Sequence, residues 1–259
     1  MYVAVDDLDL YTQTQGEGET VVLLHGFPWT HRIWETLVRS LAREYRVLAP
    51  DLRGMGASRA SAGPYLMEQL AGDTAALLDA LGIERATIVG HSLGGYVALA
   101  FARMYDARVA RLALVTSRLA ADAPELARSR RELAARIEEE HAVDAVLDTM
   151  LPRLFAPRSP AALVESARAI ARENSPAGLA AVLRGMAMRD DARDIAAELG
   201  MPVVVIAGAE DPNLSLAEAR DQADAFPNAD LVVLEGAGHM PMLEDPAALE
   251  RAIRALLAR

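Results

Sequence analysis

One serine in this sequence has neighbours that would suit a nucleophile. Ser92 lies in the pentapeptide GHSLG at residues 90–94, between an apolar run at 87–89 and helix-forming residues that continue to about 105. These features predict a strand, a sharp turn and a helix, with Ser92 at the strained apex of the turn. Gly90 and Gly94 leave the space that such a turn requires. The turn would lift the Ser92 hydroxyl out of a sheet and aim the Leu93 N–H at the same space.

The pentapeptide needs support from the rest of the chain. Glycine and serine each make up roughly 7% of average sequences, so a chance match in a chain of this length has odds of about one in ten. A glycine-rich turn that only links a strand to a helix is the alternative. The deciding question is whether other residues can activate the serine.

Two residues late in the chain could activate Ser92. A serine hydroxyl needs a general base, and the base needs a group that orients it. His239 lies in a glycine-flanked loop directly after an apolar run at 231–234, and Asp211 directly follows another at 203–207. Because the carboxyl ends of parallel strands meet at one edge of a sheet, these loops should meet the Ser92 turn.

The sequence also allows structural roles for these residues. His239 could simply bridge two loops, and Asp211 could cap a following helix. Glu210, next to Asp211, is the alternative acid. The order serine, aspartate, histidine together with the common sheet edge favours a catalytic triad of Ser92, Asp211 and His239.

A loop near the N-terminus could complete the site. A tetrahedral intermediate needs two donors aimed at its oxyanion. Leu93 N–H offers one, and the segment HGFP at 25–28, after the apolar run at 21–24, offers Phe27 N–H as the second. We expect His25 to hold this loop by hydrogen bonds, and the Phe27–Pro28 bond could be cis.

Composition limits the class of protein. The 259 residues are 52% hydrophobic, enough for a sizeable core, and carry a net charge of −11 without a basic run, so nucleic acid is not expected as a partner. The chain has no cysteine, no His-x-x-x-His spacing and no phosphate-binding loop, and we expect neither a metal nor a cofactor. Residues 1–7 do not resemble a signal peptide, and no apolar run is long enough to span a membrane. We therefore expect a cytoplasmic protein.

The order of apolar and amphipathic segments predicts an α/β fold. Residues 8–14 alternate between apolar and polar side chains and precede a Gly-rich turn. This pattern predicts an N-terminal hairpin, with residues 21–24 as the next strand. Strands and helices then alternate to residue 116 and again from 202, which favours a mostly parallel sheet covered on both faces. Four or five short helices are expected between 118 and 199. Asp245 should cap the last helix, with Pro246 at its first position.

The motifs together resemble the α/β-hydrolase superfamily, and within it the bacterial carboxylesterase, enol-lactonase and cofactor-free haloperoxidase group. The matching segments are HGFP at 25–28, DLRGMGAS at 51–58, GHSLGG at 90–95, GAED at 208–211 and GH at 238–239. The resemblance implies an eight-stranded sheet in a core formed by residues 1–117 and 200–259, with residues 118–199 inserted as a helical cap. It also implies a serine hydrolase that cleaves a small ester or lactone through an acyl-enzyme.

The resemblance and the residues leave other activities open. Perhydrolysis and hydroxynitrile-lyase chemistry would use the same triad, and a ligand-binding scaffold with little turnover is an alternative from another class. Substrate identity is not readable, nor is the choice between monomer and homodimer.

The sequence also suggests roles for several residues outside the triad. Trp29, His91, Met186 and Met240 are candidates for the substrate pocket. Asp51 and Arg53 are expected to form a structural ion pair behind the site. His31 and His141, which lie among charged residues, are expected to face solvent.

Overall fold

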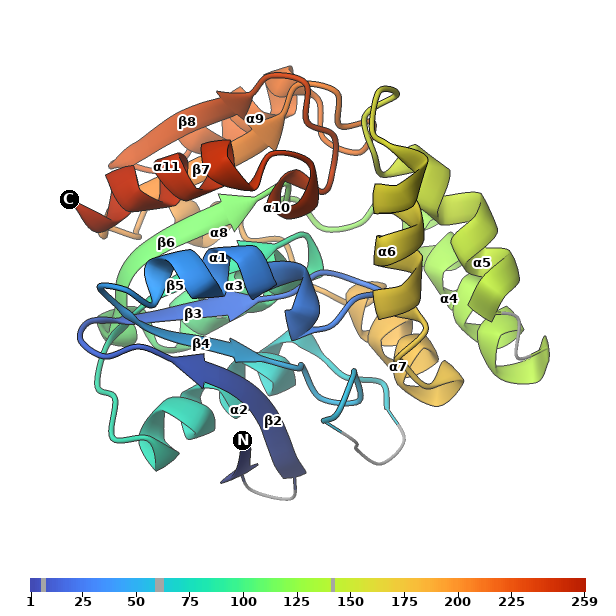
Figure 1. Cartoon of the computed structure of the whole chain (residues 1–259), viewed down its shortest axis with the longest axis horizontal. Helices are drawn as coiled ribbons and strands as arrows, with labels where there is room; N and C mark the ends of the chain where they lie inside the picture. Colours follow the sequence, from blue (N-terminus) through green and yellow to red (C-terminus); the bar gives the residue numbers. More distant parts are fainter. Residues whose placement is uncertain (6–7, 59–62, 141–142) are drawn as a thin grey trace.

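A single mixed sheet organises the fold. The structure is a computed structural model that describes residues 1–5, 8–58, 63–140 and 143–259. Eight strands of the described chain pair in the order β1-β2-β4-β3-β5-β6-β7-β8 (Figure 1). β1 (Tyr2–Val5) and β2 (Leu8–Gln15) are antiparallel to each other, and β2 is antiparallel to β4 (Arg46–Pro50). The remaining pairs are parallel, so the predicted eight-stranded, mostly parallel sheet is confirmed.

The central strands are apolar because both of their faces are covered. Every residue is buried in β3 (Thr20–Leu24), β5 (Ala86–His91) and β7 (Val203–Gly208). β6 (Val109–Val115) lies between β5 and β7, and β8 (Ala229–Leu234) forms the far edge. Continuous apolar runs of this kind are typical of strands packed between two helical layers.

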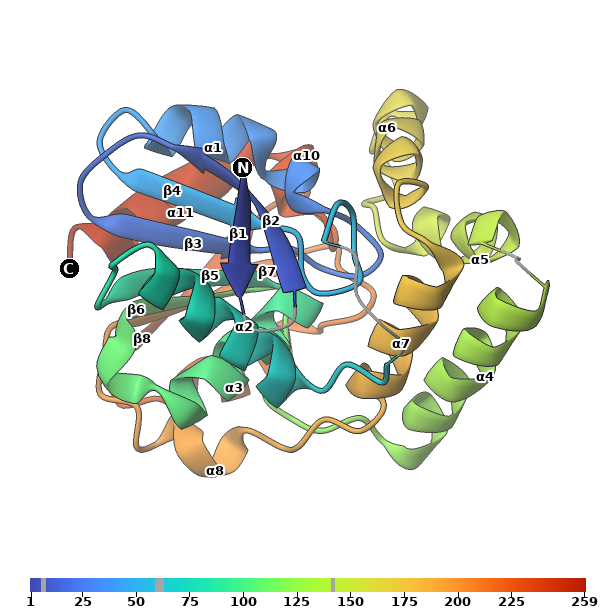
Figure 2. The ribbon, with the colours of Figure 1, turned by 90° about the horizontal axis from the view of Figure 1, so that it is seen from below.

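Two helical layers cover the sheet. α2 (Met67–Ala80), α3 (Leu93–Met104) and α9 (Leu216–Asp224) contribute to the core that contains Val22 and Leu24. α1 (Glu35–Leu41), which follows the 3₁₀ turn η1 (His31–Trp34), and α11 (Pro246–Leu257) pack on the opposite face with Val21 and Leu23 (Figure 2). As predicted, Asp245 caps α11 and Pro246 occupies its first position.

The chain between β6 and β7 is helical, as expected. Its described residues form α4 (Pro124–Glu140), α5 (Val143–Met150), η3 (Leu151–Arg153), α6 (Ala161–Ala171), α7 (Pro176–Met186) and α8 (Arg193–Ala196). α4 to α7 gather beyond the ends toward which the parallel strands point (Figures 1 and 2). α8 instead returns to the core, where Ile195 and Ala196 are buried. No helix in the described ranges is long and apolar enough to cross a bilayer.

The predicted N-terminal hairpin is wrong. β4 lies between β2 and β3, and the antiparallel partners of β2 are β1 and β4. Gly16, with a φ of +80°, lets the chain turn tightly against the end of α1, where a methyl group would lie 2.2 Å from the Tyr45 carbonyl oxygen. The fully buried β3 can therefore enter the centre of the sheet, while the half-exposed β2 stays toward its edge.

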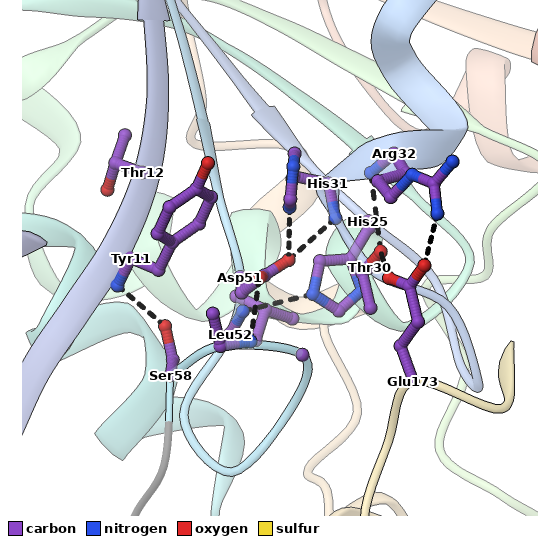
Figure 3. Close-up of polar contacts among 12 residues, drawn as sticks. Tyr11, Thr12, His25, Thr30, His31, Arg32, Asp51, Leu52, Ser58 and Glu173 are labelled. Carbon is purple, nitrogen blue, oxygen red and sulfur yellow. Dashed lines mark hydrogen bonds and ion pairs between the residues drawn. The ribbon is translucent and has the colours of Figure 1, made fainter. Parts of the chain in front are cut away.

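A buried polar cluster supports the loop that follows β3 (Figure 3). Asp51 Oδ1 accepts hydrogen bonds from His31 N at 2.7 Å and His31 Nδ1 at 2.8 Å, and Oδ2 accepts from Ala57 N at 3.0 Å. His25 Nε2 accepts from Leu52 N at 3.0 Å, which agrees with the expected holding role of His25. These bonds fasten residues 25–31 to the loop after β4.

Two expectations for this region are wrong. His31 does not face solvent, because its imidazole is only 14% exposed and is bound to Asp51. Asp51 and Arg53 make separate interactions: Arg53 donates from Nε and Nη2 to the Asp73 carboxylate of α2, at 2.8 and 2.6 Å. His141 lies outside the described residues.

Burial changes the proton affinities of this cluster. The pKa of His25 is lowered, chiefly because burial disfavours the imidazolium, although Asp51 opposes the shift. Burial alone would raise the pKa of Asp51, but the hydrogen bond from His31 and the nearby histidines bring it below its ordinary value. The cluster is therefore held with His25 neutral and Asp51 ionised.

We predict that Asp73→Asn lowers the free energy of unfolding by about 3–5 kcal/mol, because it leaves the buried Arg53 guanidinium without its carboxylate. Urea denaturation measures the change. Glu140→Gln is the control, since Glu140 pairs with Arg136 at 3.9 Å where both side chains are more than half exposed. That change should cost less than about 1 kcal/mol. Equal effects of the two substitutions would contradict the assignment of a buried pair.

We also predict that stability falls as the pH drops below about 6.5, the usual histidine value. His25 has a lowered pKa in the folded state, so the unfolded chain binds the proton first and acidification favours unfolding. Asp51 adds a further loss when the pH falls through its own lowered pKa. Denaturation curves at pH 7.5, 6.5 and 5.5 should show a shallower decline for His25→Gln, by up to about 1.4 kcal/mol per pH unit. An unchanged decline would exclude this role of His25.

Candidate active site

Ser92 occupies a strained turn between β5 and α3. Its φ of 48° is uncommon for a residue with a side chain and costs about 1–3 kcal/mol. Hydrogen bonds hold the turn: Ser92 N donates to Val115 O at 3.0 Å, and Ser92 O accepts from Gly95 N at 2.9 Å and Ser117 Oγ at 2.8 Å. The turn is the one that the pentapeptide predicts.

Gly90 and Gly94 are required by close approaches of the backbone. A methyl group at Gly90 would lie 2.3 Å from the Gly94 carbonyl oxygen, and one at Gly94 would lie 2.2 Å from the Leu24 carbonyl oxygen. Any larger residue would push the turn away from β3. The two glycines thus keep Ser92 at the carboxyl ends of the central strands.

His239 is joined to Asp211 at the same edge of the sheet. His239 Nδ1 lies 2.8 Å from Asp211 Oδ2, and Asp211 Oδ1 accepts from Asn213 N at 2.8 Å. Because an ionised carboxylate only accepts hydrogen bonds, Nδ1 carries the proton and Nε2 of the neutral ring keeps its lone pair. His239 and Ser92 line one cavity of about 190 Å³.

The structural alternatives for Asp211 are not supported. Ser215, and not Asp211, caps α9, with its side chain accepting from Glu218 N. Glu210 accepts from Arg158 Nη2 at 3.2 Å, whereas the acid bonded to His239 is Asp211. The contact geometry therefore selects Asp211 over its neighbour.

The loop that carries His239 is fixed by its own backbone. His239 O accepts from His91 Nε2 at 2.9 Å and from Thr116 Oγ1 at 3.0 Å. His239 N donates to Leu154 O at 2.8 Å, which links the loop to the helical segment between β6 and β7. Burial, followed by the nearby His239, places the pKa of His91 well below its ordinary value, so His91 is a neutral donor here.

Glu244 is a supporting residue that sequence reasoning missed. Its Oε2 accepts from Gly238 N at 2.9 Å and Met240 N at 3.0 Å, the two residues that flank His239. Its Oε1 accepts from Ala156 N and Ser159 Oγ, both at 2.7 Å. One carboxylate thus ties both sides of the His239 loop to residues 156–159. Its place in the short helix α10 (Pro241–Glu244), five residues after His239, was the available signal.

The two backbone N–H groups that we expect to bind an oxyanion belong to Phe27, after β3, and Leu93, the first residue of α3. Among the described residues, neither Phe27 N–H nor Leu93 N–H meets an acceptor, so both remain available. Phe27 lines the cavity, and the Phe27–Pro28 bond is cis. Asn174, which sequence reasoning also missed, donates from Nδ2 to Pro28 O at 2.6 Å and accepts from Gly56 N at 2.7 Å. Asn174 therefore fastens the Phe27 loop to the loop after β4.

Of the four residues expected to line the substrate pocket, one lines the cavity and three do not. Met186 lines the cavity, together with the apolar residues Leu126, Met150, Leu154 and Leu214. Trp29, His91 and Met240 do not line it, and each is fully buried. The expectation for these three is wrong because each packs inside the core: Trp29 Nε1 donates to Ala167 O at 3.1 Å, and His91 supports the His239 loop.

Metal ligands do not gather at this site. Within the described ranges, no three histidine, aspartate or glutamate side chains are grouped so that they could hold an ion. The polar side chains that line the cavity belong to Ser92, Tyr96, Thr116, Arg118, Arg130, Asn213 and His239.

The chain is similar to known proteins along nearly its whole length. An esterase from Thermogutta terrifontis, solved with malate bound, matches with a TM-score of 0.96 and 34% identity, covering 100% of this chain and 97% of that one. The enol-lactonase from Burkholderia xenovorans LB400 matches with a TM-score of 0.92 and 29% identity over the whole of both chains. The 3-oxoadipate enol-lactonase 2 of Acinetobacter baylyi is 27% identical over 255 residues, 97% of this chain and 93% of its own.

The family model described as alpha/beta hydrolase fold matches residues 19–246, which include the Ser92 turn, Asp211 and His239. Such a match extends well beyond any single motif. The chain therefore belongs to the alpha/beta hydrolase fold family.

Proposed function

We propose that this protein is a serine hydrolase that cleaves a small carboxylic ester or lactone through an acyl-enzyme. The observation that carries the proposal is the 2.8 Å hydrogen bond from His239 to Asp211, with His239 and Ser92 lining one cavity. Relatives named as an esterase and as enol-lactonases support the choice of substrate class.

In the acylation step, His239 Nε2 takes the proton from Ser92 as its oxygen attacks the substrate carbonyl carbon. Asp211 holds the ring in the tautomer that has its proton on Nδ1 and stabilises the imidazolium that forms. The negative charge that develops on the carbonyl oxygen is bound by the N–H groups of Phe27 and Leu93. His239 then gives its proton to the leaving alkoxide.

In the deacylation step, the neutral His239 removes a proton from water, which attacks the acyl carbon. The same two N–H groups bind the second oxyanion, and the proton returns to Ser92 as the acid product leaves. A lactone would follow the same course, except that the alcohol formed on acylation stays attached to the acyl chain.

The domain division follows from the same proposal. We infer that residues 1–117 and 200–259 form the catalytic core and that 118–199 act as a cap. Cavity-lining residues from α4, α5 and α7, among them Leu126, Met150 and Met186, support this division. The core would then supply the reaction and the cap the choice of substrate.

We predict that Ser92→Ala lowers kcat for a p-nitrophenyl ester by at least about 10³-fold, because the nucleophile is lost while the fold stays intact. Initial rates and a circular dichroism spectrum measure both quantities. The exposed Ser129 of α4 gives the control, and Ser129→Ala should keep the parent rate. Retention of more than about one per cent of turnover by Ser92→Ala would exclude Ser92 as the nucleophile.

We predict that Glu244→Gln lowers kcat/KM for the same ester by about 10- to 100-fold, because an amide cannot accept four hydrogen bonds and His239 loses its fixed position. Steady-state kinetics measure the effect at a temperature where denaturation curves show that the variant is folded. Glu235→Gln, an exposed position in the same loop, should change the rate less than about threefold. Equal rates for the two variants would show that Glu244 does not position His239.

A further inference from the structure

The charge inside the cavity is opposite to that of the protein. The whole chain carries a net charge of −11. Arg118 and Arg130, however, are among the described residues that line the cavity, and no aspartate or glutamate is among them. Two guanidinium groups therefore share the cavity of Ser92 and His239.

Arg130 of α4 has hydrogen-bonding capacity to spare. Its Nε donates to Asp122, and its Nη1 faces the Met186 sulfur at 3.8 Å, which is a weak acceptor. Its Nη2 meets no acceptor within the described ranges. The side chain is only 17% exposed, so few waters can replace the absent partner.

The single negative charge of Asp122 does not balance the positive charges of the arginines that it contacts. It also accepts from Arg189 Nη2 at 3.0 Å, so one carboxylate serves two guanidinium groups. Arg189 in turn lies over the ring of Tyr96, 4.0 Å from its centroid, and Tyr96 lines the cavity. This group of charges leaves one positive charge uncompensated where side-chain burial makes electrostatic interactions strong.

Arg118 also lines the cavity. It follows Thr116, which holds the His239 carbonyl oxygen, by two residues. Its only ion pair within the described ranges is a loose one, Nη2 to Glu218 Oε1 at 3.6 Å, and the other oxygen of Glu218 caps α9. Arg118 is about one-third exposed and can turn toward a ligand.

We propose that the substrate of this site is an ester or lactone that carries a free carboxylate, which Arg118 and Arg130 bind. The proposal rests on the proposed serine-hydrolase function and names the substrate class of the same cavity. A guanidinium binds a carboxylate through two parallel N–H···O bonds, with more directional preference than an ammonium group. The one uncompensated positive charge matches a monoanion.

The rest of the lining supports a short substrate. Leu126, Met150, Met186 and Leu214 provide an apolar wall, suited to a few methylene groups between the two polar ends. A cavity of about 190 Å³ is below the range of about 300–1,000 Å³ that drug-sized ligands occupy. A small dicarboxylic half-ester, or a lactone with a carboxylate side chain, fits this description.

The test compares monomethyl glutarate, an anion at neutral pH, with dimethyl glutarate, its neutral counterpart. We expect the wild-type protein to hydrolyse the anion with the higher kcat/KM. Arg130→Gln and Arg118→Gln should each lower the anion-to-neutral ratio of kcat/KM at least tenfold, because the loss falls mainly on the charged substrate. Arg136→Gln is the matched control, since Arg136 lies on the same helix, is 56% exposed and pairs with Glu140. It should leave the ratio unchanged.

The outcomes separate this proposal from the proposed function. A wild-type preference for the neutral ester, or equal losses on both substrates in the two variants, would overturn the carboxylate assignment while esterase activity stands. Turnover that survives in Ser92→Ala would instead overturn the proposed function. Calorimetric binding of monomethyl glutarate to Ser92→Ala, weakened at least tenfold when Arg118→Gln is added, supports the anion site without requiring turnover, and equal binding by both proteins contradicts it.

Discussion

The backbone conformation of Ser92 is the constraint on which the rest of the site depends. Ser92 and Thr116 are the two non-glycine residues of the described chain with a positive φ, 48° and 45°. They directly follow the adjacent strands β5 and β6, and each makes a hydrogen bond to a residue from another loop of the site. The Ser92 carbonyl oxygen accepts from Ser117 Oγ, and Thr116 Oγ1 donates to the His239 carbonyl oxygen. Strain at the ends of two neighbouring strands is thus offset by hydrogen bonds, one of which also fixes the backbone of His239.

The His239 loop joins the two parts of the structure. Leu154 O accepts from His239 N, and Glu244 holds the residues beside His239 together with Ala156 and Ser159. A shift of the helical segment would therefore act directly on the position of the imidazole. The Phe27 loop has a similar tie through Asn174, which binds Pro28 O. The helical segment between β6 and β7 is therefore linked directly to both loops.

The sequence predicted the fold and the central contacts because they depend on local patterns. The sheet could be predicted from the apolar runs and from the glycines around Ser92. The order of the strands was enough to predict that Asp211 lies next to His239. The supporting roles of Glu244, Asn174 and His31 could not be predicted from the sequence. Their hydrogen-bond partners lie 20 to 146 positions away in the chain or are backbone groups, which leave no signal in the sequence. The placement of Trp29, His91 and Met240 failed for a related reason. Nearness to a motif in the chain does not tell which side of a loop faces the cavity and which faces the core.

The proposed function requires that Ser92 be an activated nucleophile. The most direct measurement is intact-protein and peptide mass spectrometry after exposure to a fluorophosphonate, which reacts with a serine that has a working base and oxyanion donors. We expect one adduct per chain, located on the peptide that contains Ser92, and slower labelling when Asp211 is replaced by asparagine. A protein that stays unlabelled, or that is labelled at another residue, would contradict the claim and favour a ligand-binding role for this fold.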